Sequence, residues 1–364
     1  MPTRLLIKRF VLWLVIGICI LPLLAIPDSN VEYVHIGVFV LFHPQILIFH
    51  PATGHQFVFT DSTGKIKLTA VPEDGLEIQL AGERLRVIMN GTQQEASDVQ
   101  IRPVNSKEED FDLTIPNKIH RRFQGTLDIK VEQNSLSPVV VMELETAVAS
   151  VVAAEAQPGT PIEGLKAQAV ATRSYLIAGK GRHTSFDFCD STHCQFLRSI
   201  PASGSKAQRA VQETRGQVIV YKDVTLAAMF SASCGGRTRT LLENGMKVDE
   251  NAYPYYSVIC KRCQRSPEHW NVRLSKQQAD VLMEHPTEKE RLKVAHELSW
   301  SNLPSNDFKI HSENGTFIAV GKGHGHGMGL CQRGAAAMAA SGNDYRMILE
   351  HYYPNTSIST IQVH

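Results

Sequence analysis

Short apolar stretches separated by turn residues dominate the first third of the chain. Glycine, aspartate, asparagine and proline divide them, and the clearest are Gln56–Phe59, Ile66–Thr69, Leu76–Leu80 and Leu85–Ile88. Runs of this length between turn residues predict β-strands. The apolar run Val34–His50 is interrupted by glycine, histidine and proline and predicts paired strands, with a second membrane segment as the alternative. We therefore predict a β-rich accessory region over residues 30–135.

Helical spacing begins after Val139. The segment Thr160–Glu163 has the form of a capping box with proline at the first helical position. It predicts a helix that ends near residues 179–181. A preceding helix over Glu143–Ala154 places Glu155 at its end, where a carboxylate gains nothing from the helix dipole. That placement is unfavourable unless the group is hydrated, paired or used.

The remaining segments alternate between strand and helix patterns. Strands are predicted over Gln217–Tyr221 and Leu226–Ser231, a charged surface helical region over 275–298, and a final helix over Asn343–Tyr353. The whole pattern predicts an α+β fold, with a mixed helix and sheet domain over residues 136–364.

The amino terminus predicts export. Arg4, Lys8 and Arg9 precede the uncharged segment Phe10–Ile26, which is the pattern of a signal peptide or a short membrane anchor. No clean small-residue cleavage site precedes Asp28, so residues 1–27 favour an uncleaved anchor over a cleaved signal, with a buried core helix as a further alternative. The positive flank stays inside. We therefore expect a membrane-anchored or secreted protein whose remainder is extracytoplasmic, in the cell envelope.

Composition narrows the partners. The 364 residues carry 37 basic and 36 acidic side chains, a net charge of +1, and the length allows about two domains. Without the three basic residues of the apolar segment's flank the charge becomes −2. A balance so close to neutral gives no support for a nucleic-acid partner.

Glycine occupies every odd position from Gly321 to Gly329. In an extended segment this pattern leaves one face as bare backbone and presents His324 and His326 on the other. Bare glycine indicates that another backbone or a ligand approaches closely. We expect a ligand-facing strand with one of these histidines in the site; tight sheet packing with incidental histidines is the alternative.

Two cysteine-containing groups have metal-ligand character. His183, Cys189, His193 and Cys194 lie within twelve residues, and these residue types bind zinc, whereas a Cys189–Cys194 disulfide is a competitor in an exported protein. The second group is Cys234 with the pair Cys260 and Cys263, for which a disulfide is favoured over a metal with His269 as a fourth ligand. A nucleophilic Cys331 with His326 as its base is a weaker alternative.

Glu155 is the carboxylate with the strongest catalytic character. Small and apolar residues flank it on both sides. Apolar surroundings raise the pKa of a carboxyl group and keep a proton available for general-acid catalysis. A solvated glutamate at a helix end is the alternative.

In combination these motifs resemble the stage II sporulation protein D (SpoIID)/LytB family. The resemblance runs from about Arg121 to Ile358 and rests on Val151–Glu155, Leu165–Tyr175, Phe186–Gln195, Ser233–Gly236, the glycine-rich segment through Gln332, and Ile348–Pro354. Cys331 stands where many members have serine, and Ala156 where many have methionine.

The resemblance implies a lytic transglycosylase that cleaves peptidoglycan glycan strands between MurNAc and GlcNAc, with Glu155 as the single acid/base and 1,6-anhydro products. It implies a glycan cleft lined by the substrate-binding residues Arg173, Tyr175, Gln195, His326 and Gln332. It also favours a structural zinc ion at His183, Cys189, His193 and Cys194, and implies no organic cofactor. A non-catalytic glycan-binding module that activates a cell-wall amidase is the second hypothesis, and a zinc hydrolase the third.

Overall fold

The computed structural model describes residues 32–64, 66–105, 108–247, 252–284, 287–299 and 301–361. The predicted anchor or signal at residues 1–27 lies outside them. In the part of the chain that the structure describes, no helix is long and apolar enough to cross a membrane.

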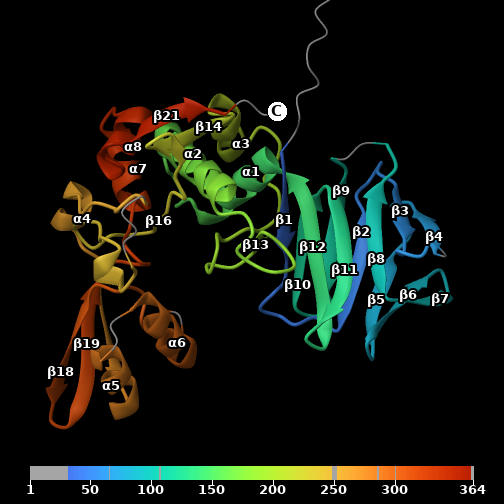
Figure 1. Ribbon diagram of the computed structural model, residues 1–364, viewed down its shortest axis with the longest axis horizontal. Helices are drawn as coiled ribbons and strands as arrows, with labels where there is room; N and C mark the ends of the chain where they lie inside the picture. The colour runs from blue at the N-terminus through green and yellow to red at the C-terminus, as the bar shows by residue number, and fades with distance from the viewer. Residues whose placement is uncertain are drawn as a thin grey trace, which may run out of the picture.

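The first third of the described chain folds into two sheets packed face to face (Figure 1). One sheet has the order β13 (Phe188–Cys189), β1 (Tyr33–Gly37), β12 (Ser135–Glu143), β11 (Thr126–Glu132), β8 (Asp98–Pro103), β3 (Phe57–Thr60) and β4 (Lys67–Ala70). The other has the order β10 (Ile119–Gln124), β9 (Asp110–Ile115), β2 (Ile46–Pro51), β5 (Leu76–Ala81), β6 (Arg84–Met89) and β7 (Thr92–Ala96). The predicted β-rich character is confirmed.

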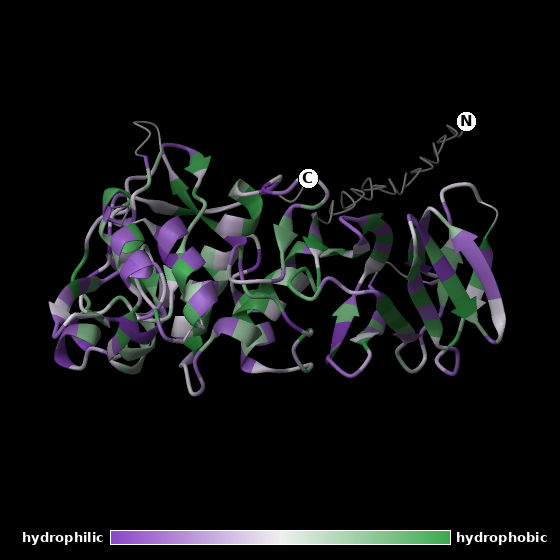
Figure 2. Ribbon diagram, turned by 90° about the horizontal axis from the view of Figure 1, so that it is seen from below, coloured by the Kyte–Doolittle hydropathy of each residue, from purple (hydrophilic) through white to green (hydrophobic). Residues whose placement is uncertain are grey.

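Aromatic side chains from both sheets fill the space between them. Phe49 of β2 lies 5.0 Å from Phe111 of β9 and 5.1 Å from Phe57 of β3, measured between ring centroids. Alternating green and purple along these strands in Figure 2 follows the inward and outward alternation of a half-buried sheet. The prediction of paired strands in Val34–His50 is wrong in one respect: β1 pairs with β12 and β13, whereas β2 pairs with β5 and β9. The intervening loop takes the chain from one sheet to the other.

A helical layer continues directly from the sandwich, because β12 runs into α1 (Leu144–Glu155). The central helix, α2 (Ile162–Ala178), packs against α1 and the elements α3 (Lys206–Glu213), α7 (Gln332–Ala340), α8 (Tyr345–Tyr352) and β14 (Gln217–Tyr221). Strands β15 (Val224–Thr225) and β21 (Ser357–Thr360) flank β14. The mixed α+β class is confirmed, and so are the predicted helices, within a few residues at each end.

The predicted capping box before α2 does not form. Pro161 is the N-cap and makes no side-chain cap, while the Thr160 hydroxyl donates to the carbonyl of Gln157. Glu163 instead accepts the backbone N–H of Tyr345 and pairs with Lys166. Tertiary contacts have replaced the local ones.

The rest of the described chain forms a small lobe. Parallel strands β16 (Phe230–Ser231) and β20 (Leu330–Cys331) mark its base, together with η1 (Leu242–Asn244) and α4 (Lys261–Arg265). Beyond them, an arm consists of β17 (His269–Leu274), β18 (Phe308–Glu313), β19 (Thr316–Lys322), α5 (Lys276–Glu284) and α6 (Glu288–Leu298) (Figure 1). The arm has its own hydrophobic cluster, centred on Leu274, Leu282 and Val294.

Candidate active site and metal centres

Glu155 is the last residue of α1 and is half-buried. The helix begins where β12 ends, and its buried residues, among them Val148, Val151 and Val152, fix it against the sandwich. The chain leaves the helix in an extended conformation at Ala156. Glu155 is therefore held by a rigid element while its side chain reaches the long loop that joins α2 to α3.

The environment of Glu155 favours its neutral form. Burial raises the pKa of the Glu155 carboxyl above its ordinary value, and one hydrogen bond from the backbone N–H of Phe196, at 2.9 Å to Oε1, offsets part of that rise. No cationic partner contributes to the shift of this pKa. The direction predicted from the apolar flanks is confirmed. A carboxyl group in such a setting holds a proton at a pH where an exposed glutamate has lost it.

Two glutamines lie beside Glu155. The Gln332 side-chain amide donates to the Glu155 backbone carbonyl at 3.1 Å, which satisfies an acceptor that a helix end leaves open. Gln195 precedes Phe196 and is buried, and its side-chain oxygen has no hydrogen-bond partner among the residues that the structure describes. A buried acceptor without a partner is costly and calls for a ligand or a water molecule. The structure thus brings three sequence-predicted site residues together.

A surface hollow of about 280 Å³ adjoins the end of α1. Ala153 and Ala154 form one wall, and the loop residues Arg198 and Ser199 form another, with Ile119, His120 and Arg121 of β10 and its flank completing the lining. The sequence offered no signal for Arg198, His120 or the Phe196 backbone N–H. The fold brings the Phe196 N–H to the Glu155 carboxyl, and it brings Arg198 and His120 to the hollow at Ala153 and Ala154, which Glu155 itself does not line.

Arg173 lies elsewhere, inside the protein. Its side chain has 0% exposure and makes two hydrogen bonds to the Glu145 carboxylate, at 2.8 and 2.6 Å. It also donates to the backbone carbonyl of Gln217 at 3.0 Å. With these partners and no exposed surface, Arg173 joins α1, α2 and β14 and leaves nothing for a glycan to contact.

Tyr175 is also buried, on the side of α2 that faces the histidine and cysteine loop. Its ring lies 5.8 Å from that of Phe188, and the guanidinium of Arg182 lies over it at 5.5 Å. Burial raises the pKa of Tyr175 well above its ordinary value. The phenol therefore remains protonated. Its ring packs against the loop that carries the histidines and cysteines, and it does not line the hollow beside α1.

The glycine-rich segment is not the extended strand that its alternation predicts. β19 ends at Lys322, and Gly323, Gly325, Gly327 and Gly329 all have positive φ, between 64° and 93°. A Cβ on Gly329 would lie 2.1 Å from the Met229 carbonyl oxygen. Close neighbours therefore account for these glycines, which is the packing alternative: backbone at Gly323 and Gly329, and side chains at Gly325 and Gly327.

His326 is tied into this packing. The backbone N–H of Met328 donates to its Nδ1 at 3.0 Å, and the ring makes a further backbone hydrogen bond with Phe230. Burial lowers the pKa of His326, so the ring is neutral. The charges that act most on it are Glu288 and Arg291 of α6, not Glu155. This placement favours a structural role.

The first histidine and cysteine group does come together. The ligand atoms of His183, Cys189, His193 and Cys194 all lie within 4.8 Å of one another. Neither cysteine is in a disulfide. His183 Nε2 lies 3.2 Å from Cys194 Sγ, and His193 Nδ1 lies 3.7 Å from Cys189 Sγ and 3.6 Å from Cys194 Sγ.

These separations fit a tetrahedral zinc site. With ordinary Zn–S and Zn–N bond lengths, sulfur and nitrogen ligands stand about 3.6 Å apart. A hydrogen bond with Cys194 lowers the pKa of Cys189, while the same interaction and burial raise the pKa of Cys194. A cation provides the charge that both thiolates together require. The donor set therefore fits the predicted ion.

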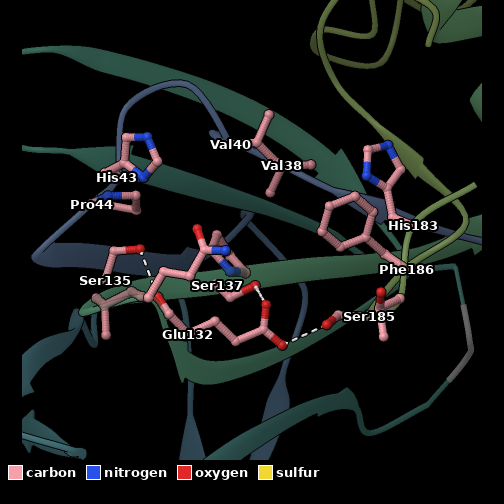
Figure 3. Close-up of a pocket in the computed structure, with 14 residues that line it drawn as sticks. Val38, Val40, His43, Pro44, Glu132, Ser135, Ser137, His183, Ser185 and Phe186 are labelled. Atoms are coloured by element: carbon pink, nitrogen blue, oxygen red, sulfur yellow. Dashed lines mark hydrogen bonds between the residues drawn. The ribbon is translucent and has the colours of Figure 1, made fainter. Parts of the chain in front are cut away.

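A cavity of about 330 Å³ opens next to this group, between β12, the loop after β1 and the loop that carries His183 (Figure 3). His183 and Phe186 lie together at one end of it, with ring centroids 4.6 Å apart. Along its floor the Glu132 carboxylate accepts hydrogen bonds from Ser185 and Ser137. The bond from Ser185 anchors the loop to the sandwich, whereas the bond from Ser137 joins neighbouring strands. Both carboxylate oxygens of Glu132 therefore already have hydrogen-bond partners.

We expect this site to hold one zinc ion per chain. Replacing Cys189 by serine should remove about one equivalent of zinc and loosen the loop that supplies the Phe196 N–H, since His193 and Cys194 immediately precede it. Elemental analysis of the purified full chain measures the ion, and Thr192→Ala, an exposed change in the same loop, is the control. Equal zinc content in wild type and Cys189→Ser would contradict the assignment.

The remaining cysteines also form a group. Cys234, Cys260, Cys263 and Cys331 are all buried, with their sulfur atoms within 4.8 Å of one another, and none is in a disulfide. The favoured disulfide is therefore absent from the structure, and His269, which lies exposed on β17, is not the fourth member. Cys331 takes that place. Its burial beside Cys263, at 3.6 Å, is also inconsistent with a nucleophile paired with His326.

Comparison with known proteins agrees with the motif resemblance. A family model described as "Stage II sporulation protein" (SpoIID) matches residues 132–221, the segment that holds Glu155 and the first histidine and cysteine group. Over 268 residues the chain is 30% identical to an uncharacterized protein of Brachyspira hyodysenteriae, covering 65% of this chain and 72% of the relative.

Two further relatives carry functional names. The stage II sporulation protein D of Bacillus amyloliquefaciens is 25% identical over 285 residues, 65% of this chain and 80% of that protein. The amidase enhancer of Bacillus subtilis is 25% identical over 280 residues, 55% of this chain but 38% of its own length. The chain belongs to the SpoIID/LytB family.

Proposed function

We propose that this protein acts on the cell wall as a lytic transglycosylase, cleaving MurNAc–GlcNAc bonds of peptidoglycan glycan strands with Glu155 as the only acid/base. The observation that carries the proposal is the half-buried Glu155 carboxyl at the end of α1. Burial raises the pKa of this carboxyl, and the Gln332 side chain holds the Glu155 backbone carbonyl in place. One carboxyl group is sufficient because the attacking hydroxyl belongs to the substrate, whereas a glycoside hydrolase needs two carboxyl groups.

The reaction balances with one proton. The Glu155 carboxylic acid protonates the glycosidic oxygen as the bond from C1 of MurNAc breaks, and the freed GlcNAc keeps that oxygen as a hydroxyl. The Glu155 carboxylate then removes the proton from the C6 hydroxyl of the same MurNAc, whose oxygen closes onto C1. The product is a 1,6-anhydro ring, Glu155 is protonated again, and no water is consumed.

Neighbouring groups suit a sugar substrate. The unpaired oxygen of Gln195 would accept a hydroxyl or amide N–H, and Arg198 and His120 at the hollow beside α1 would contact adjoining sugars. The Phe196 N–H would steady the carboxylate formed midway. In this proposal Gln332 positions Glu155, and Arg173, Tyr175 and His326 support the fold instead of binding glycan. The zinc ion at His183, Cys189, His193 and Cys194 would supply rigidity to the loop and no reacting group.

The second candidate is a non-catalytic glycan-binding activator of a cell-wall amidase. It is favoured by one relative, which is named an amidase enhancer. Under either candidate the protein would work in the cell envelope, attached through its amino-terminal segment or secreted.

An assay with isolated glycan strands separates the two candidates. The purified full chain should release fragments with 1,6-anhydro ends when no amidase is present. Glycan binding with no cleavage, together with faster stem-peptide removal when an amidase is added, would overturn the transglycosylase and support the activator.

The raised pKa of Glu155 gives a stability prediction that needs no substrate. Below the ordinary carboxyl pKa the folded and unfolded chains both hold the proton, and Glu155 has no effect. As pH rises from there through the raised folded pKa, the unfolded chain releases its proton first, and the wild type loses stability. Each unit of difference is worth about 1.4 kcal/mol.

Glu155→Gln removes this titration and retains an acceptor for the Phe196 N–H. The variant should therefore gain thermal stability relative to wild type at pH 7, and the gain should shrink toward pH 4. Melting curves at both pH values measure it. A difference in melting temperature that does not change with pH would show that Glu155 has an ordinary pKa.

A further inference from the structure

Four cysteines from three distant parts of the chain meet in the base of the small lobe. Cys234 follows β16, Cys260 and Cys263 lie at the start of α4, and Cys331 ends β20. Each is at most 3% exposed, and all four sulfurs lie within 4.8 Å of one another. We propose that Cys234, Cys260, Cys263 and Cys331 bind a second zinc ion, which is structural and separate from the site at His183–Cys194.

The sulfur geometry fits a single tetrahedral ion. With an ordinary Zn–S bond length, thiolates at the corners of a tetrahedron stand about 3.8 Å apart. Cys263 Sγ and Cys331 Sγ are separated by 3.6 Å. An iron–sulfur cluster with four iron atoms and bridging sulfides would hold its cysteine sulfur atoms farther apart than the 3.6 Å between Cys263 and Cys331. Four sulfur ligands in a closed, buried site are typical of structural zinc.

Hydrogen-bond donors surround the sulfurs as they do in thiolate sites. Cys331 is the N-cap of α7 and accepts the backbone N–H groups of Gly334 and Cys234, both at 3.4 Å. The Tyr352 hydroxyl donates to Cys260 at 3.5 Å. These donors and the positive end of α7 stabilise negative charge on sulfur. Four protonated thiols would not need them.

Backbone details also serve the cluster. Gly334 is required where it stands, since a Cβ there would lie 1.9 Å from the Tyr352 hydroxyl and 2.6 Å from Cys260 Sγ. Gly235 and Gly236, directly after Cys234, both have positive φ and turn the chain, and the Gly236 carbonyl accepts the N–H of Cys260. The turn therefore aligns two ligands.

The site has a defined mechanical role. The arm that contains β17–β19 leaves the base after Cys263 and returns before Cys331, so one ion would close both ends of this long insertion. The residue after Cys331 is Gln332, whose amide holds the Glu155 carbonyl. Zinc binding at the four cysteines does not depend on the proposed activity; only this link to Glu155 rests on it.

The test measures metal on the full chain. Wild type purified without chelators should contain about two zinc ions per chain. Cys260→Ser and Cys189→Ser should each contain one, and the double variant none; each single variant is the matched control for the other. One ion in wild type that disappears in Cys189→Ser would overturn the proposal, as would iron in place of zinc.

A second measurement leaves the four proposed ligands unchanged. In the wild type, zinc should protect Cys234, Cys260, Cys263 and Cys331 from alkylation, and a chelator under denaturing conditions should make all four reactive without reductant. Cobalt in the Cys189→Ser protein should give the charge-transfer absorption of a site with four thiolates. Cysteines that react only after reduction would reveal disulfides, and cysteines that react equally with and without zinc would reveal free thiols; either overturns the site.

Discussion

Glutamine in place of Glu155 is expected to lower the rate of glycan cleavage by roughly 100- to 10,000-fold, the contribution of a well-placed general acid. The substitution keeps the size of the side chain and an oxygen that accepts the Phe196 N–H at the distance seen for Oε1, 2.9 Å. It removes only the transferable proton. Binding of glycan strands, measured by sedimentation, should therefore change little while 1,6-anhydro products disappear.

A matched control is available on α5. Glu284 ends α5 as Glu155 ends α1, but it is exposed. Glu284→Gln should leave both cleavage and binding unchanged. Equal cleavage by wild type and Glu155→Gln would remove Glu155 from the reaction, whatever the products are.

Loss of the ion pair inside the helical layer should have the largest effect on stability. Glu145→Ala leaves the fully buried Arg173 guanidinium without its carboxylate partner, and an unpaired buried charge costs about 3–5 kcal/mol. Chemical denaturation of the full chain measures the change in the free energy of unfolding. Arg209→Ala breaks an exposed pair with Glu213 and should cost less than about 1 kcal/mol.

Denaturation and glycan binding of Arg173→Lys together decide whether Arg173 stabilises the fold or binds substrate. Lysine cannot reproduce the two parallel bonds of a guanidinium, so Arg173→Lys should also be destabilised. Its glycan binding, measured well below its melting temperature, should equal that of wild type. A stable Arg173→Lys with weakened glycan binding would restore the substrate-binding role that the family motif implied.

Local patterns predicted the elements better than their partners. The helix over Glu143–Ala154 and the strand Gln217–Tyr221 follow from periodicity and turn residues, and the structure has both. The pairing of β1 with β12 does not follow from periodicity, because the paired residues, such as Gly37 and Val139, are far apart along the chain. Periodicity specifies which face of an element is buried and leaves open what it is buried against.

The candidate site shows the same division. Apolar neighbours in the sequence predict a raised pKa for the Glu155 carboxyl, and burial in the fold raises it. Arg173 occupies a family motif position, yet a motif cannot distinguish a residue that binds substrate from one that holds the helices together. The grouping of Cys331 with Cys234, Cys260 and Cys263 does not follow from the sequence, because these neighbours lie 68 to 97 residues away along the chain.

The most direct test of the account is the origin of oxygen in the cleaved ends. Glycan strands are digested by the full wild-type chain in water enriched in ¹⁸O, and the fragments are weighed by mass spectrometry. If the C6 hydroxyl of MurNAc closes onto C1, the new ends are 1,6-anhydro rings and contain no ¹⁸O. Fragments that carry ¹⁸O at a MurNAc reducing end would identify a hydrolase and contradict the mechanism proposed for Glu155.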